Sequence, residues 1–171
     1  MPEYQRRIDV MLDGAYIDRL GDRSLDELRS MHRECLEVET EVSYVRRLAL
    51  ARIDIIDAEL ERRARGGGAN ELIDRLPEIL AGEPGRPGPA NSRFPQQLAP
   101  SMDIPWRRGL ERLITDATLI NLPTLSETEL RETLGQLRLL KNEVTERRRR
   151  LHRVIDAIDQ ELTARPAVGQ A

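Results

Sequence analysis

The chain has 171 residues and a net charge of −3, with 33% charged and only 3% aromatic residues. This composition argues against an ordinary globular core and is typical of long helices that bury a narrow apolar seam. The mixed, slightly acidic charge does not indicate attraction to nucleic acid or to an anionic membrane. A single cysteine excludes an internal disulfide, and the N-terminus lacks the apolar core of a secretion signal, so we expect a cytoplasmic protein.

After an N-terminal segment over 1–23, of which 4–20 is weakly amphipathic and interrupted by Gly14, the sequence predicts a first long helix over 24–65. Ser24 and Glu27 have the spacing of a capping box, and the glycines at 66–68 end the helix. Apolar residues follow steps of three and four, with one extra step of four between Ala49 and Ile53, which indicates a coiled-coil seam with a stutter. This first seam consists of Leu28, Met31, Cys35, Val38, Val42, Val45, Ala49, Ile53, Ile56 and Leu60.

The segment over 66–125 is predicted to hold two short helices, near 70–81 and near 106–120. Asn70 is the expected cap of the first. Between these helices, residues 82–105 are rich in proline and glycine, and we expect a disordered linker there.

A second long helix is predicted over 126–165, before a tail over 166–171. It begins at another capping box, Ser126 with Glu129, and ends before Pro166. Its seam consists of Leu130, Leu134, Leu137, Leu140, Val144, Leu151, Ile155, Ile158 and Leu162, and turns polar at Arg147.

The two long helices are copies of one another. When residues 24–60 are placed over 126–162, a constant offset of 102 without gaps, 14 of 37 positions are identical. A single long helix with a narrow seam is poorly stable alone. The predicted fold is therefore all-α: a long antiparallel two-helix coiled-coil hairpin with short accessory helices. A homodimer with exchanged helices is the alternative.

A second, polar stripe runs about 100° around each helix from the seam, at 100° of rotation per residue. In the first copy it contains Glu39, Ser43, Arg46, Leu50 and Asp54, and in the second Lys141, Thr145, Arg148, His152 and Asp156. Hydroxyl, arginine and aspartate recur at matching places. In an antiparallel hairpin the two rows approach each other, so we expect them to form one site.

Arginine can donate two hydrogen bonds to guanine O6 and N7 or neutralise a phosphate, and a carboxylate can accept from the guanine ring N–H and amino group. A cyclic dinucleotide of guanine presents all these groups with two-fold symmetry. The alternative is that the stripe forms surface ion pairs, which are common on long helices.

The stretches SYVRRLALARIDIIDAEL and TERRRRLHRVIDAIDQEL, with SLDELR upstream, resemble the RsiG family of cyclic-di-GMP-dependent anti-sigma factors of actinobacteria. The family signature, E-x3-S-x2-R-x3-Q-x3-D on each helix, places the ligand contacts here at Glu39, Ser43, Arg46, Asp54, Thr145, Arg148 and Asp156. Three positions depart from it: Leu50, Lys141 and His152.

The resemblance implies that the protein binds cyclic di-GMP, as a dimer of the nucleotide, and in that form sequesters a WhiG-like sporulation or flagellar-type sigma factor. Ile8, Leu12, Leu110 and Leu113 are hypothetical sigma contacts. The rival is a coiled-coil adaptor that binds a protein partner without nucleotide.

An enzyme is not expected, because neither His32 nor His152 has a nucleophile or a metal-ligand spacing nearby in the sequence. Cys35 lies on the seam, where we expect it to be buried. The basic run at 146–150 lies within a helix without interleaved aromatic residues. It therefore does not predict direct binding of nucleic acid. No metal and no membrane are expected.

Overall fold

The computed structural model describes residues 7–81 and 121–165 of the chain. The described elements, in chain order, are α1 (Arg7–Met11), η1 (Gly14–Tyr16), η2 (Leu20–Asp22), α2 (Leu25–Arg65), α3 (Ala69–Ala81), η3 (Leu122–Thr124) and α6 (Glu127–Ala164). All of these elements are helical, as the sequence predicts. The expected linker over 82–105 and the expected helix near 106–120 lie outside the described residues.

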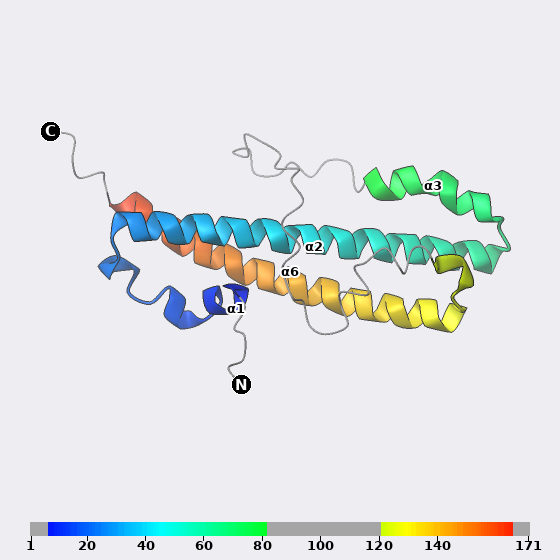
Figure 1. Cartoon of the computed structure of the whole chain (residues 1–171), viewed down its shortest axis with the longest axis horizontal. Coiled ribbons are helices and arrows are strands. Elements are labelled where there is room, and N and C mark those ends of the chain that lie inside the picture. Colours follow the sequence, from blue (N-terminus) through cyan, green and yellow to red (C-terminus); the bar gives the residue numbers. More distant parts are fainter. Residues whose placement is uncertain (1–6, 82–120, 166–171) are drawn as a thin grey trace. The chain divides into compact units, whose positions relative to one another are not determined.

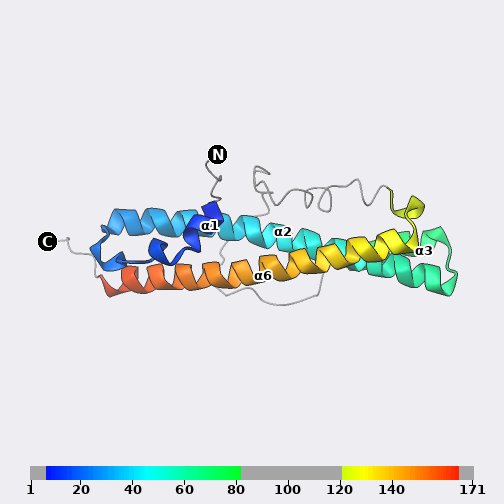
Figure 2. The ribbon, with the colours of Figure 1, turned by 90° about the horizontal axis from the view of Figure 1, so that it is seen from below.

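The chain divides into two compact units, and both long helices contribute to each. Unit 1 comprises Met1–Ser43 and Glu143–Ala171, and unit 2 comprises Tyr44–Asn142. Within unit 1 the α2 and α6 segments lie side by side, with α1 and the turns after it alongside (Figures 1 and 2). Within unit 2 the α2 segment is paired with the α6 segment, and α3 follows the end of α2.

Contacts in each unit show that the helices are antiparallel. In unit 1, His32 Nε2 lies 3.0 Å from Asp159 Oδ1. Glu39, which is farther along α2, contacts Arg148 and His152, which are earlier in α6. Partners of later α2 residues therefore come earlier in α6. In unit 2, Arg138 Nη2 lies 3.1 Å from Asp57 Oδ2, and Arg63, which is later in α2, donates to the carbonyl of Leu125, which precedes α6. The hairpin prediction is confirmed, and the paired helices belong to one chain.

The predicted seams form the core of both units. In the first copy every seam residue is buried except Met31 and Leu60, which are half-buried, and in the second copy every one is buried except the half-buried Leu162. Cys35 is fully buried, as predicted, with its Sγ 3.8 Å from the Tyr16 hydroxyl. In unit 2, Ile55 and Leu122 join this core, and Leu72, Leu76 and Ile79 of α3 pack against it.

Both long helices begin at the predicted capping boxes. The Ser24 amide and hydroxyl donate to Glu27 Oε2 at 2.7 and 2.9 Å, and the Glu27 amide donates back to Ser24 Oγ at 3.2 Å. Ser126 and Glu129 repeat this arrangement at 2.8, 2.7 and 3.2 Å. These bonds satisfy amide groups that have no partner within the first turn of a helix.

The glycine run stops α2 through a Schellman motif. Gly66 has φ +70°, its amide donates to the Arg63 carbonyl at 3.1 Å, and the Gly67 amide donates to the Arg62 carbonyl at 3.0 Å. A residue with a side chain would be strained at this φ. The chain then turns directly into α3, which begins at Ala69, one residue before the expected cap. Asn70 therefore lies in the first turn rather than at the N-cap, and that prediction was wrong.

The duplication extends beyond the range that sequence identity revealed. Turns η2 and η3, which precede the long helices, are also related by the offset of 102. Arg63 Nε donates to Glu59 Oε1 at 2.6 Å, and its terminal nitrogens donate to the carbonyls of Leu122 and Leu125. A second cluster has the same contacts at the other end of the repeat: Arg165 donates to Glu161 and to the carbonyls of Leu20 and Arg23. Arg165 and Glu161 lie 102 positions after Arg63 and Glu59, and Leu20 and Arg23 lie 102 positions before Leu122 and Leu125.

We call these two clusters the arginine clamps. Each one ties the C-terminal end of one long helix to the turn that precedes the other long helix, one clamp in each unit. Residues related by the offset of 102 are hereafter called equivalent.

Candidate functional site

The polar stripe of the first copy lies on one uninterrupted helix, α2, so its residues keep helical spacing throughout. Glu39 and Ser43 belong to unit 1, whereas Arg46, Leu50 and Asp54 belong to unit 2. On α6, Lys141 belongs to unit 2, and the other stripe residues, Thr145, Arg148, His152 and Asp156, belong to unit 1. Each unit therefore holds residues from both copies of the stripe.

In unit 1 the two copies meet at the carboxylate of Glu39. Arg148 Nε donates to Glu39 Oε1 at 2.8 Å and to Ser43 Oγ at 2.8 Å. The Ser43 hydroxyl donates to the same Glu39 oxygen at 2.7 Å, and His152 Nε2 lies 3.1 Å from it. We call these four residues, Glu39, Ser43, Arg148 and His152, the Glu39 cluster. All four are stripe residues that the sequence singled out.

The Glu39 cluster is partly shielded from solvent, which strengthens its electrostatics. The side chain of Glu39 is 20% exposed, against 38% for Arg148 and 45% for His152. Burial raises the pKa of Glu39, but the hydrogen bonds from Ser43, His152 and Arg148 together outweigh it and hold this pKa below its ordinary value. Glu39 is therefore ionised at neutral pH, as an acceptor for N–H donors must be.

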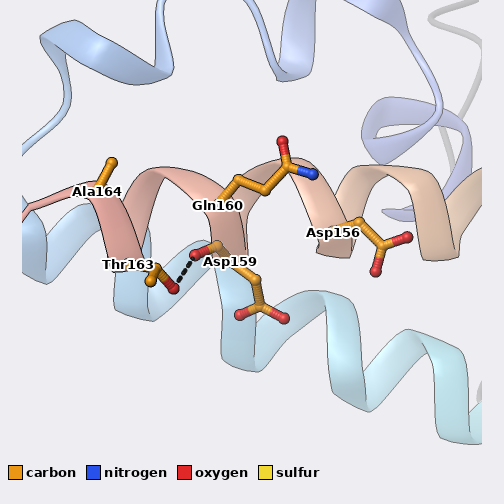
Figure 3. A pocket seen from close by; sticks show the side chains of 5 residues that line it. All are labelled: Asp156, Asp159, Gln160, Thr163 and Ala164. Carbon is orange, nitrogen blue, oxygen red and sulfur yellow. Dashed lines mark hydrogen bonds between the residues drawn. The ribbon is translucent and has the colours of Figure 1, made fainter.

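Asp156 lies apart from the Glu39 cluster, farther along α6 toward its C-terminal end. It is exposed and lines an open surface depression with Asp159, Gln160, Thr163 and Ala164. Figure 3 shows the carboxylates of Asp156 and Asp159 extending from α6, with the Thr163 hydroxyl donating to the Asp159 carbonyl at 2.8 Å. The other stripe residues on α2 and α6, Arg46, Asp54, Lys141 and Thr145, each interact with another group in the structure.

The N-terminal segment docks on α6 where the second seam turns polar. Arg147 occupies the seam position, its side chain is only 17% exposed, and its guanidinium pairs with Asp9 at 3.0 Å and with Glu143 at 3.2 Å. Arg150 Nη2 donates to the Leu12 carbonyl at 2.9 Å. Sequence reasoning missed the role of Asp9, although a lone arginine in an apolar seam signals a required acidic partner.

Two apolar side chains of α1, Ile8 and Met11, are buried. Ile8 is 6% exposed and Met11 3%, so both side chains belong to the core, and the contact of Ile8 and Leu12 with a sigma factor stays a prediction. Burying these side chains removes apolar surface from water and holds α1 in place. Leu110 and Leu113 lie outside the described residues.

No group of His, Cys, Asp and Glu within 7–81 and 121–165 is arranged to hold a metal ion. In the same part of the chain no helix combines the length and apolar character needed to cross a bilayer.

The Glu39 cluster can present charged donors and an ionised acceptor to one ligand. Arg148 contacts Glu39 and Ser43 through Nε, which is one of the five N–H donors of a guanidinium. An arginine held in this way has a defined orientation, and the carboxylate beside it accepts N–H groups but repels phosphate. Such a pair suits a ligand that offers N–H donors and acceptors along one edge, as a guanine base does.

Comparison with known proteins identifies one related family. Residues 14–80 match the family model described as RsiG-like. This range contains the first polar stripe, α2 and nearly all of α3, whereas the second copy lies beyond it. No curated protein matches the chain. Over residues 14–80 the chain is thus similar to the RsiG-like family, and this likeness points to a regulatory function of the anti-sigma-factor type.

Proposed function

We propose that the protein is an anti-sigma factor that binds cyclic di-GMP through its two polar stripes. In its nucleotide-bound form it would sequester a WhiG-like sigma factor from RNA polymerase. The observation that carries the proposal is the Glu39 cluster, in which residues from both copies of the motif meet. The RsiG-like match over the first copy supports the same reading.

The proposed contacts follow from the chemistry of guanine. Arg46 and Arg148 would donate to guanine O6 and N7 or to phosphate. Glu39, Asp54 and Asp156 would accept from the ring N–H and the amino group, and Ser43 and Thr145 would supply hydroxyls. Arg148 Nε donates to Glu39, so a ligand that uses both residues must replace that ion pair or fit around it.

Regulation would follow from linkage. A ligand that binds the complex of anti-sigma and sigma better than it binds either protein shifts the equilibrium toward the complex. The concentration of cyclic di-GMP would then decide how much sigma factor is available to polymerase.

The second candidate function is an adaptor that binds a protein partner without nucleotide. It is favoured by the fact that Glu39 already has three partners within the chain, so the stripe would serve to join α2 to α6. In this interpretation the Glu39 cluster stabilises the pairing of α2 with α6 and does not bind a ligand.

Isothermal titration with cyclic di-GMP, with and without a WhiG-like sigma factor, separates the two functions. We expect saturable binding that cyclic di-AMP does not reproduce. Arg148→Ala should weaken binding by tenfold or more, on the order of the loss of a charged hydrogen bond. Arg149→Ala is the matched control, because its side chain is 74% exposed and pairs only loosely with Glu146, at 3.6 Å. Absence of binding under both conditions would leave the adaptor.

A further inference from the structure

The short helix α1 docks in unit 1 at the same level as the Glu39 cluster. Arg7 Nη2 donates to Glu37 Oε2 at 3.0 Å, and Glu37 lies on α2 two residues before the acid of the cluster. Arg147 Nη1 donates to Asp9 Oδ1 at 3.0 Å, and Arg147 immediately precedes the arginine of the cluster on α6. Helix α1 therefore contacts both of the helices that supply the cluster, next to the residues that form it.

Arg147 is a charged residue at an apolar position of the second seam. Its equivalent in the first copy is Val45, which is 4% exposed, and the seam residues on either side of Arg147 are fully buried. The side chain of Arg147 has two acidic partners, Asp9 at 3.0 Å and Glu143 at 3.2 Å. Glu143 lies one turn earlier on the same helix, so of these two acids it is Asp9 that ties the guanidinium to another element.

Two ion pairs hold α6 from different directions at this level. Arg147 and Arg148 are consecutive, so their side chains leave the helix about 100° apart. Arg148 Nε reaches Glu39 on α2 at 2.8 Å, whereas Arg147 reaches Asp9 on α1. His152, one turn after Arg148, lies 3.1 Å from the same oxygen of Glu39. A rotation of α6 about its own axis changes both ion pairs at once, so together they define how α6 presents Arg148 and His152 to Glu39.

We propose that Asp9 is a positioning residue for the ligand site, because its pair with Arg147 sets the rotation of α6 that brings the Glu39 cluster together. As regards the ligand, the inference rests on the proposed function. The dependence of the cluster on Asp9 is a property of the protein without nucleotide and is tested separately. Ile8 and Met11 are 6% and 3% exposed, so their burial keeps α1 docked when the acid is removed.

The first test is the pKa of Glu39, measured in the full chain by NMR titration of the carboxyl carbons. Burial raises this pKa, and hydrogen bonds from the other three members of the cluster outweigh burial and hold it below its ordinary value. Asp9→Ala should raise the pKa of Glu39 toward the ordinary value, and Asp9→Glu should restore it. Loss of a negative charge acting through space alone would lower the pKa instead, so the sign of the change identifies positioning. Asp18→Ala, which removes an exposed acid from the same N-terminal segment, is the matched control.

A double-mutant cycle tests whether Asp9 acts through Arg147. Arg147→Val gives the second seam the residue of its equivalent position, Val45, and removes the need for an acidic partner. In this background Asp9→Ala should leave the pKa of Glu39 unchanged. The same change of pKa with and without Arg147 would overturn the proposal, and so would an unchanged pKa in a folded Asp9→Ala protein. If Asp9→Ala does not fold, the isosteric Asp9→Asn takes its place in the same measurements.

Isothermal titration with cyclic di-GMP tests the functional part of the inference. Asp9→Ala should weaken binding several-fold, although Asp9 lies outside both polar stripes, and Asp18→Ala should bind as wild type does. Arg147→Val/Asp9→Ala should bind as Arg147→Val does. If wild-type protein binds and Asp9→Ala binds equally tightly, the positioning of the ligand site by Asp9 fails alone. If wild-type protein binds no nucleotide, the proposed function fails, and the pKa of Glu39 still decides whether Asp9 positions the cluster.

Discussion

At the scale of single residues, the carboxylate of Glu39 joins the two copies of the motif. It accepts from Ser43 on its own helix and from Arg148 on the other, and His152 lies beside it. Charged hydrogen bonds of this kind are stronger than neutral ones, and partial burial strengthens them further. The same contacts that would orient groups for a ligand also stabilise the pairing of α2 with α6 in unit 1.

Glu39→Gln should lower the free energy of unfolding at pH 7 by about 1 to 2 kcal/mol, because the amide keeps the shape of the carboxyl but loses its charge. The pKa of Glu39 is lower in the folded protein than in the unfolded chain, where it is about 4.3. The stabilisation is therefore present above the unfolded value and is lost as pH falls through the lower folded value. The difference between the two proteins should disappear in that acidic window.

Urea unfolding followed by circular dichroism, at pH 7 and at several values below pH 4.5, measures this difference. Glu37→Gln is the matched control, since its side chain is 64% exposed and its ion pair with Arg7 lies at the surface. Surface pairs of this kind contribute little. A pH-independent difference for Glu39→Gln would contradict the charge-based account.

At the scale of elements, the arginine clamps connect each long helix to the turn before the other. In the clamp of unit 2, Glu59 is 2% exposed and also accepts from Arg62, whose hydrogen bond lowers the pKa of this carboxyl. Arg63 adds bonds to two backbone carbonyls there. One guanidinium thus satisfies a buried acid and two carbonyls at a helix junction.

Arg63→Lys should lower the free energy of unfolding by about 1 to 3 kcal/mol, because lysine keeps the charge but lacks the planar fork that reaches three acceptors. Arg165→Lys should cost less, since its partner Glu161 is 28% exposed whereas the side chain of Glu59 is 3% exposed. The experiment is urea unfolding of both variants, with the exposed Arg65→Lys as control. Equal costs for Arg63→Lys and Arg165→Lys would show that burial of the acid does not decide the effect.

At the scale of the whole molecule, one duplicated sequence builds both units. The seams of the two long helices supply most of the buried apolar side chains, and short elements complete each core. In unit 1 these are Ile8 and Met11 of α1, and in unit 2 they are Leu122 and the apolar face of α3. A two-helix seam is narrow, so a single buried leucine is a large part of it.

Leu137→Ala should lower the free energy of unfolding by about 2 to 5 kcal/mol, because Leu137 is fully buried in the core of unit 2 and its removal leaves a cavity. Leu139→Ala removes the same atoms from a residue that is 72% exposed on the same helix. It should change the free energy by less than about 0.5 kcal/mol. Thermal and urea unfolding of the pair test whether burial in the seam, rather than helix propensity, sets stability.

Much of the fold was predictable, because its signals are local or periodic. Steps of three and four place apolar side chains on one face of any helix, so the seam residues could be named before their partners were known. The capping boxes and the Gly66 stop depend on neighbouring residues alone. Asn70 shows the limit of such signals, because the glycines before α3 let the helix begin one residue earlier.

The pairing of polar side chains was less predictable. Periodicity places Glu39 and Arg148 on the flanks of their helices, but the register between the helices decides that they meet. Asp9 and Arg147 are 138 positions apart, and only docking of α1 brings them together. The partial burial of Leu60 and Met31, and the full burial of Glu59, likewise depend on what packs over them.

The sequence by itself determined the helical class, the duplication, the seams, the helix ends and the residue types of the polar stripe. Each of these depends on spacing along one chain, and helix geometry converts spacing into a face or an end. The tertiary structure decided the Glu39 cluster, the arginine clamps and the docking of α1 on Arg147. These depend on contacts between residues far apart in sequence, and such contacts arise only when buried apolar surfaces set the register in which two helices pack.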